Sequence, residues 1–388
     1  MFDSYKIICT AISIITMLCL SCKDKDISAE RERRAKKAKG DITIAVAGSW
    51  DKLKGNADMY NGVELAVEEI NKTNILNGRK IHLIAKGDSA DLNKARLVAS
   101  EIVNNADITA VIGHSFGFIT SSAAEIYTRG GLLLIAPCQY IPEKAKDAGQ
   151  MEFSFMPRPD SISEMFVKYM QKMKYKTVVI AYVKGPSSIK ILNSFYNAGE
   201  GRIKIVDSVP FNINDVVSFK NIVKKWTHLE FDAILFIAPP YYLDNLLMDL
   251  RDNNMKMPIL VTAEPMLLSN APEMKERLSD EVFLLTCNHD NKSNELKQFI
   301  SEFNNKYKYQ PNHVAINAYD AVKVLANAWA SVGTAQPIKT AQEMSKMKAI
   351  NGLCGTYSFD ESGLLNTSQM YLVRVRDGKI EHINDDSR

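Results

Sequence analysis

The sequence lacks the patterns that mark metalloproteins, nucleotide-binding enzymes and nucleic-acid-binding proteins. The three cysteines after residue 22 contain no C-x-x-C pair, and the histidines show no metal-ligand spacing, so we expect no metal site. There is no P-loop and no dinucleotide-binding glycine pattern, because Gly48-Ser49-Trp50 lacks the later glycines, and we expect no cofactor. The net charge is only +3 at pH 7, which argues against a nucleic-acid partner.

The sequence also has no apolar run as long as a membrane span. The apolar run over residues 7–20 follows Lys6 and ends before Ser21-Cys22. Its 14 residues suit the h-region of a signal peptide and fall short of the ~20 residues of a span. A small residue followed by cysteine resembles the bacterial lipoprotein signal. We therefore expect a signal peptide over 1–21, lipidation at Cys22 and a periplasmic or extracytoplasmic location; an ordinary cleaved signal and a short anchor are the alternatives.

The next segment is dominated by charge. Residues 23–39 hold 8 Lys and Arg against 4 Asp and Glu. Such a stretch predicts a solvated tether over 22–40, in coil or helical form, that holds a folded domain off the membrane. Contact of its basic side chains with anionic lipid headgroups is the alternative. The remaining cysteines, Cys138, Cys287 and Cys354, allow at most one disulfide.

From residue 41, short β-branched runs alternate with amphipathic stretches, which predicts parallel sheets covered by helices on both faces. The first round predicts strands and helices at 42–48, 58–72, 80–86, 91–104, 108–113, 120–129 and 132–137. After the break at 156–160, the second round predicts them at 161–174, 177–183, 187–198, 203–209, 215–226, 233–238, 241–253, 258–263 and 282–287. Helices at about 292–307 and 312–332 and strands at 355–360 and 370–376 complete the chain.

Six segments carry a resemblance to one family: 41–49 (DITIAVAGS), 60–71 (YNGVELAVEEIN), 77–91 (NGRKIHLIAKGDSAD), 111–127 (VIGHSFGFITSSAAEIY), 131–137 (GLLLIAP) and 350–365 (INGLCGTYSFDESGLL). In order and spacing they resemble the Leu/Ile/Val-binding family of periplasmic substrate-binding proteins. The resemblance implies the two-lobed type I fold, each lobe a mostly parallel sheet flanked by helices. We expect lobe 1 over 41–158 plus 289–365, and lobe 2 over 159–288 plus 366–388.

The same resemblance implies a function. It predicts a solute-binding protein of an ABC importer that closes around an amino acid or related small molecule, delivers it to an inner-membrane permease and catalyses no reaction. A ligand-sensing module without a transporter is the first alternative. The chain departs from the amino-acid-binding members at Tyr140, where a Thr is expected, and at Gly185-Pro186-Ser187-Ser188, which replaces a Tyr-Gly pair. The cysteine pair of some members is missing, with Ser89 and Phe116 near those places.

Ligands of parallel α/β sheets bind at the carboxyl ends of the strands, where the candidate site residues lie. The helix predicted at 120–129 would offer free N–H groups to an anionic group, with Ser122 and Glu125 as a capping box. The expected contacts from the first lobe are Trp50, Ser115, Phe116, Gly117, Phe118, Thr120, Cys138, Gln139 and Tyr140. Those from the second lobe are Asp160, Tyr182, Tyr241 and Glu264. The resemblance implies that Asp160 and Glu264 accept the ligand ammonium, whereas core packing is the alternative for any single aromatic residue.

One motif supports a different class of protein. Gly113-His114-Ser115-Phe116-Gly117 is a G-x-S-x-G sequence between a predicted strand and a predicted helix, as in the nucleophile elbow of a serine hydrolase. His289 and His313 are the later histidines for a triad. No His-Gly-Gly type loop lies upstream and no acid and histidine follow in the required order, so the hydrolase stays the second alternative.

Overall fold

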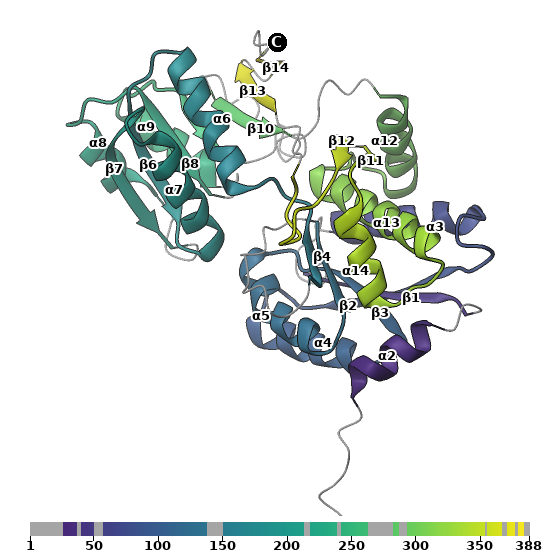
Figure 1. Cartoon of the computed structure of the whole chain (residues 1–388). Coiled ribbons are helices and arrows are strands. Elements are labelled where there is room, and N and C mark those ends of the chain that lie inside the picture. The colour runs from purple at the N-terminus through teal and green to yellow at the C-terminus, as the bar shows by residue number, and fades with distance from the viewer. Residues whose placement is uncertain are drawn as a thin grey trace, which may run out of the picture.

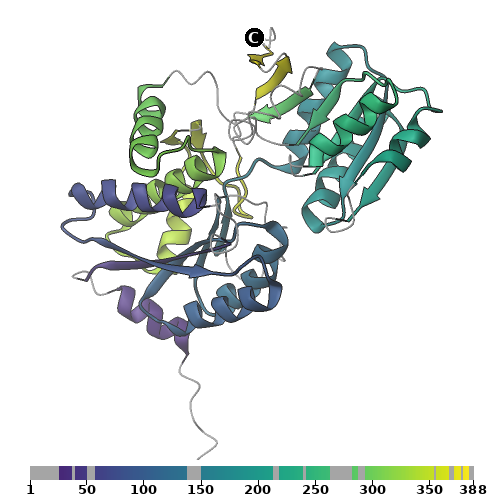
Figure 2. The same ribbon diagram turned by 180° about the vertical axis from the view of Figure 1, so that it is seen from behind.

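The protein consists of two α/β lobes joined by extended segments (Figures 1 and 2). The computed structural model describes residues 26–36, 40–49, 57–137, 150–212, 218–238, 242–262, 282–286, 293–353, 355–366, 371–376 and 379–383. The two-lobed fold with parallel sheets is confirmed. The exact lobe boundaries stay predictions.

Lobe 1 is built on a parallel sheet in the order β2-β1-β3-β4-β5. Its strands are β1 (Ile42–Gly48), β2 (Ile81–Gly87), β3 (Ile108–Gly113), β4 (Leu133–Ala136) and β5 (Glu152–Ser154). The helices that follow the first three strands are α3 (Asp58–Lys72), α4 (Leu92–Asn104) and α5 (Gly117–Arg129). Three later helices complete the lobe: α12 (Asn294–Tyr307), α13 (His313–Val332) and α14 (Pro337–Lys346). Apolar cores lie on both sheet faces, which explains why these strands are almost continuously apolar.

One glycine allows two helices of lobe 1 to pack at close range. A Cβ atom at Gly62 on α3 would lie 2.1 Å from the backbone oxygen of Ala315 on α13. Any larger residue at position 62 would therefore separate the helices that cover this face of the sheet.

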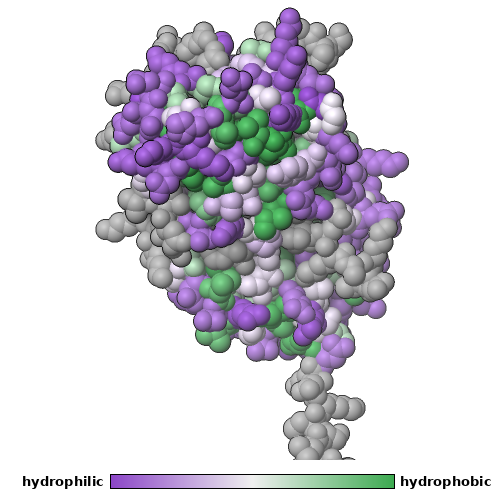
Figure 3. All heavy atoms as spheres, turned by 90° about the vertical axis from the view of Figure 1, so that its left-hand side faces the viewer, coloured by the Kyte–Doolittle hydropathy of each residue, from purple (hydrophilic) through white to green (hydrophobic). Residues whose placement is uncertain are grey.

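Lobe 2 has a seven-stranded sheet in the order β14-β13-β10-β9-β8-β6-β7. Five strands are parallel: β6 (Thr177–Val183), β7 (Lys204–Phe211), β8 (Ala233–Ile237), β9 (Ile259–Val261) and β10 (Val282–Thr286). The last two strands are β13 (Tyr371–Arg376), which pairs antiparallel with β10, and β14 (Lys379–His382), which pairs antiparallel with β13. The described helices of this lobe are α6 (Pro159–Lys172), α7 (Pro186–Gly199), α8 (Lys220–Trp226) and α9 (Leu243–Asp252). Hydrophilic residues cover much of the side of the molecule shown in Figure 3, with apolar patches between them.

Two of the segments that join the lobes lie side by side. The Ser154 N–H donates to the Gly363 carbonyl at 2.9 Å, and Arg158 forms an ion pair with Asp360. Gly363 has a φ of +75°, and a Cβ there would lie 2.0 Å from the Glu152 oxygen, so this turn requires glycine. The hairpin of β11 (Ile350–Gly352) and β12 (Gly355–Tyr357) leads into the second segment. These contacts hold the two segments together where the lobes meet.

The prediction of a solvated tether over 22–40 is wrong for residues 27–35. They form α2 (Ile27–Ala35), which packs on lobe 1 with the Arg31 side chain fully buried. The charge pattern does not reveal this, because the groups that bind Arg31 are backbone carbonyls from distant parts of the chain. No helix in the described part of the chain is long and apolar enough to cross a bilayer.

The other differences concern the ends of elements and short elements. The helix predicted at 120–129 begins three residues earlier, at Gly117, so Ser122 lies inside α5 and does not cap it. The Ser122 hydroxyl donates to the Ile119 carbonyl instead. The prediction of a capping box at Ser122 and Glu125 is therefore wrong. The sequence also did not predict α14, β5, β11 and β14.

Candidate functional site

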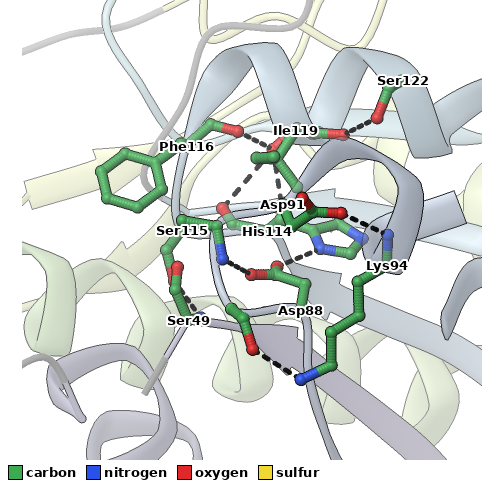
Figure 4. Close-up of polar contacts among 12 residues, drawn as sticks. Ser49, Asp88, Asp91, Lys94, His114, Ser115, Phe116, Ile119 and Ser122 are labelled. Atoms are coloured by element: carbon green, nitrogen blue, oxygen red, sulfur yellow. Dashed lines mark hydrogen bonds and ion pairs between the residues drawn. The ribbon is translucent and has the colours of Figure 1, made fainter. Parts of the chain in front are cut away.

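The lobe 1 part of the candidate site lies where strand order reverses. The chain runs from β1 to β2 on one side and returns to β3 on the other, so β1 and β3 form a topological switch point, where open α/β sheets bind ligands. Residues just past these two strands meet: the Ser49 N–H donates to the Ser115 hydroxyl oxygen at 3.2 Å (Figure 4). Ser49 is buried, and its own hydroxyl has no hydrogen-bond partner among the described residues.

A buried polar network lies next to the Ser49–Ser115 contact, inside lobe 1. His114 Nδ1 lies 2.6 Å from Asp88 Oδ2, and Nε2 lies 2.9 Å from the Tyr127 hydroxyl. The other Asp88 oxygen accepts from the Ala90 N–H at 2.8 Å. Burial, together with the Asp88 charge, raises the pKa of Tyr127 above its usual range, so this hydroxyl stays protonated. All three side chains are fully or almost fully enclosed, so the network holds the turn after β3 in one position.

The turn itself depends on close packing at Gly113. This residue has a φ of +150°, and a Cβ there would lie 2.2 Å from the Ala47 carbonyl oxygen. Thr120 completes the turn: its Oγ1 accepts from the His114 N–H at 3.1 Å and donates to the Phe116 carbonyl at 3.0 Å. Thr120 is 1% exposed, so its hydroxyl shapes the turn from inside the lobe.

The start of α5 leaves backbone donors available at this edge. Phe116 is the N-cap residue and makes no side-chain cap, and Gly117 is the first helical residue. The first N–H groups of a helix have no partner within it, and they favour negative charge. Phe116 and Gly117 are partly exposed beside Ser115, so the structure brings Ser115, Phe116, Gly117 and Thr120 into one turn.

Lobe 2 has a matching switch point between β6 and β8. Tyr182 is the next-to-last residue of β6, half-buried, and its ring packs against the core between the sheet and α6. The following helix, α7, begins at Pro186 after Gly185 and likewise has no side-chain cap. The helices that start at the two switch points, α5 and α7, approach each other across the lobes (Figure 1).

Asp160 lies at the joining segments, in the first turn of α6. Its carboxylate accepts from Arg158 Nε at 3.1 Å, and Arg158 also pairs with Asp360. The Arg158 side chain helps to hold the pKa of Asp160 below its usual range, against the opposing effect of burial. The charge of Asp160 is thus already balanced by an arginine in this conformation.

The other predicted site residues lie outside the described residues. These are Trp50, Cys138, Gln139, Tyr140, Tyr241 and Glu264, together with the lipidation candidate Cys22. Phe118 belongs to α5, but its side chain is not described. Their roles stay predictions.

The hydrolase alternative receives no support from the described geometry. His114, next to Ser115, has both ring nitrogens engaged by Asp88 and Tyr127. His313 starts α13 inside lobe 1, where burial lowers its pKa to about 4, and His289 lies outside the described residues. Within the described part of the chain, no group of three or more His, Cys, Asp or Glu is placed to hold a metal ion.

Sequence reasoning missed the residues that support the site. Asp88 follows β2 and Tyr127 lies on α5, and only the parallel sheet brings them to His114. The Arg158–Asp360 pair joins residues about 200 positions apart. The position of Asp88 directly after a strand was an available signal, because polar residues at strand ends meet at one edge of a parallel sheet.

Comparison with known proteins identifies the family. A family model described as "Periplasmic binding protein" matches residues 53–379. The chain belongs to the periplasmic binding protein family. A curated Leu/Ile/Val-binding protein of Escherichia coli is 26% identical over 48% of this chain and 52% of its own length, so the chain spans about half of that relative.

Two further relatives match over greater lengths. A leucine-, isoleucine-, valine-, threonine- and alanine-binding protein of Pseudomonas aeruginosa is 24% identical over 83% of this chain and 86% of its own length. A solved ABC transporter substrate-binding protein of Desulfitobacterium hafniense, in complex with Leu, has a TM-score of 0.75 and 25% identity, and covers 88% of this chain and 100% of its own. The resemblance predicted from the six sequence segments is confirmed, and so is the type I fold.

Proposed function

We propose that this periplasmic binding protein is the solute-binding lipoprotein of an ABC importer and binds an amino acid or a related small molecule between its lobes. The observation that carries the proposal is the Ser49–Ser115 junction at the β1/β3 switch point, next to the uncapped start of α5. Hinge closure about the joined segments at Arg158 and Asp360 would bring the β6/β8 edge onto the ligand.

Lobe 1 supplies the groups for an anionic part of the ligand. The N–H groups at the start of α5 and the Ser115 hydroxyl face the edge where the Ser49 hydroxyl, which has no partner among the described residues, also lies. A ligand carboxylate there would gain hydrogen bonds and a favourable helix dipole. Thr120 acts by holding this turn.

Lobe 2 would supply the groups for a cationic part. Asp160 is paired with Arg158, so we assign it to the hinge and assign the ammonium contact to Glu264. Trp50, Phe116, Phe118, Tyr140, Tyr182 and Tyr241, with Cys138 and Gln139, would enclose the rest of the ligand. This wall is more aromatic than a site for a small aliphatic side chain requires.

A ligand-sensing module without a permease is the alternative, since closure on a ligand serves both functions. The serine hydrolase is disfavoured because His114 is engaged on both ring nitrogens. We propose no catalytic step.

Binding is tested by a thermal-shift screen of amino acids, aromatic acids and short amides, followed by titration calorimetry. A ligand at 100 times its dissociation constant should add ~2.7 kcal/mol to the free energy of unfolding.

Glu264→Gln should weaken the binding of a zwitterionic ligand by ~2 kcal/mol, roughly 30-fold, because the ligand ammonium loses its counter-charge. Glu200→Gln, an exposed change at the end of α7, is the control. Equal affinities of Glu264→Gln and the native protein would remove Glu264 from the site.

The anchor is tested separately. Cys22→Ala should abolish labelling by a fatty-acid analogue and move the protein to the soluble fraction. Unchanged labelling in this variant would refute lipidation at Cys22.

A further inference from the structure

Arg31 attaches α2 to lobe 1 through backbone carbonyls of three other elements or their ends. Its Nε donates to the Ile108 carbonyl at 2.7 Å and its Nη2 to the Val103 carbonyl at 2.5 Å; Nη1 donates to the Gly130 carbonyl. Val103 and Gly130 stand at the carboxyl ends of α4 and α5, where the last carbonyls lack helical partners. Burial lowers the pKa of Arg31 to about 10, which leaves the guanidinium charged and suited to these negative dipole ends.

Further contacts hold α2 on its other side. The Ile338 N–H at the start of α14 donates to Glu32 at 2.8 Å, and the Thr334 hydroxyl donates to the Ala35 carbonyl at 3.1 Å. Arg34 pairs with Asp107 at 2.8 Å. The helix is thus fixed to two separate parts of lobe 1, which determines its orientation as well as its position.

The position of α2 is the end of lobe 1 opposite the candidate site. Ile108 is the first residue of β3, whereas Ser115 follows the last residue of the same strand. The neighbouring strand β1 has 7 residues, which corresponds to about 23 Å along the strand. Figures 1 and 2 agree that α2 lies at the end of lobe 1 that points away from lobe 2. We call this end of lobe 1, formed by α2, the carboxyl end of α4 and the start of β3, the basal pole.

The covalent distance from Cys22 to the basal pole is short. Asp26 caps α2, accepting from the Ser28 and Ala29 N–H groups at 3.1 Å, and it follows Cys22 by only four positions. Four Cα–Cα steps reach about 14 Å when the chain is fully extended. That length does not span the roughly 23 Å between the basal pole and the edge where the site lies.

We propose that docked α2 is a rigid mount that holds the basal pole of lobe 1 against the lipid surface and keeps the cleft and lobe 2 directed away from it. The proposal rests on lipidation at Cys22, which belongs to the proposed function. The occupant of the basal pole is the membrane that holds the anchor. A groove of about 850 Å³ lies on this pole between α2 and residues 104–106, and it would face the headgroups.

This orientation has a consequence for transport. Delivery requires a permease in the same membrane to contact both lobes. Docked α2 keeps lobe 2 away from the membrane, so the permease can contact lobe 2 only after α2 leaves lobe 1. Release would lengthen the connection from Cys22 to Asp41, 19 residues away, to about 65 Å. Undocking of Arg31 is then a required step of delivery in that membrane.

Energy transfer on liposomes tests the orientation. Two versions of the lipidated protein carry a donor dye on a bioorthogonal amino acid. One has the dye at Lys339 of α14, near the basal pole, and the other at Met248 of α9 in lobe 2. The phosphatidylcholine liposomes carry an acceptor dye on their headgroups. Both positions are exposed, and Met248 is 51% exposed. We expect transfer from position 339 to exceed transfer from position 248 at least fivefold. Arg31→Met should bring the ratio toward one, whereas Arg96→Met, an exposed change on α4 outside the groove, should keep it.

A ratio near one in the native protein would overturn the proposal, as would an unchanged ratio in Arg31→Met. If Arg31→Met does not fold, a variant with residues 26–40 replaced by a Gly/Ser linker of equal length takes its place, and the same ratio near one is expected. Fatty-acid labelling of every sample separates the outcomes: an unlabelled protein refutes the anchor, and a labelled protein with a ratio near one refutes the mount alone.

Discussion

The two ends of lobe 1 both bury a charged side chain, but they do so by different means. At the site end, Asp88 belongs to the lobe's own sheet connection and binds His114 and the Ala90 N–H, which come from the same lobe. At the basal pole, Arg31 comes from a separate helix that precedes β1 and binds carbonyls at the ends of other elements. When Asp88 is removed, His114 remains enclosed without its partner. When α2 leaves, the freed carbonyls meet water. The site end is therefore permanent, and the basal pole is built from a detachable part.

The largest expected effect is at the site end. Asp88→Ala should lower the free energy of unfolding by about 4 kcal/mol, because it leaves His114 buried without its acceptor. Urea unfolding measures the loss. Asp41→Ala is the control, since Asp41 also pairs with a histidine, His82, but at an exposed position, and it should lose less than a quarter as much. Similar losses for the two variants would contradict the assignment of the network as a support of the site.

The basal pole should respond less strongly. Arg31→Met should lower the free energy of unfolding by about 2–3 kcal/mol, since charge-assisted hydrogen bonds are lost but the carbonyls regain water when α2 detaches. Hydrogen exchange should show residues 27–36 unprotected while β1 and β3 stay protected. Protection of residues 27–36 equal to that in the native protein would show that Arg31 is not what holds α2.

The same contrast explains what the sequence could predict. The strands at 42–48, 108–113 and 177–183 follow from apolar runs that local pattern alone determines, and the structure has them at those bounds. The sequence predicts Ser115 at the site because residues that follow parallel strands share one edge. The burial of Arg31 could not be predicted, since its partners are carbonyls over 70 positions away and its neighbours are equally charged. The contacts of Ser49 and Tyr127 were missed for a similar reason, since they depend on how strands and helices pack, which the sequence does not specify.

A second buried acid, Asp58, also lies at the site end of lobe 1 and makes stability at this end depend on pH. Asp58 starts α3 and is 3% exposed; one oxygen accepts from Asn312 at 3.0 Å and the other has no partner in the described residues. Burial raises the pKa of Asp58 to about 6, above the ~3.9 of an unfolded aspartate. Between these pH values the native state binds more protons than the unfolded state, so this group makes stability fall as pH rises.

Asp58→Asn should remove that dependence. The difference in free energy of unfolding between the variant and the native protein should change by about 2 kcal/mol, in favour of the variant, from pH 4 to pH 7. Urea unfolding across this range provides the measurement, with Asp41→Asn as an exposed control that shows no such trend in this direction. A pH-independent difference for Asp58→Asn would mean that the Asp58 carboxyl ionises in the native state as it does when unfolded.

The smallest expected effect is at Ser115, which distinguishes a binding turn from a nucleophile. The Ser115 hydroxyl accepts a hydrogen bond from the Ser49 N–H at 3.2 Å, and the side chain is partly exposed. Ser115→Ala should therefore cost about 1 kcal/mol in stability or in ligand binding, the value of one ordinary hydrogen bond. Ser121→Ala, one turn into α5 and also partly exposed, serves as the control for helix effects. Labelling of the native protein by a fluorophosphonate probe, lost in Ser115→Ala and kept in Ser121→Ala, would reverse the choice in favour of the hydrolase. Such labelling requires a base that activates the Ser115 hydroxyl. His114 does not provide that base, because its ring nitrogens contact Asp88 and Tyr127.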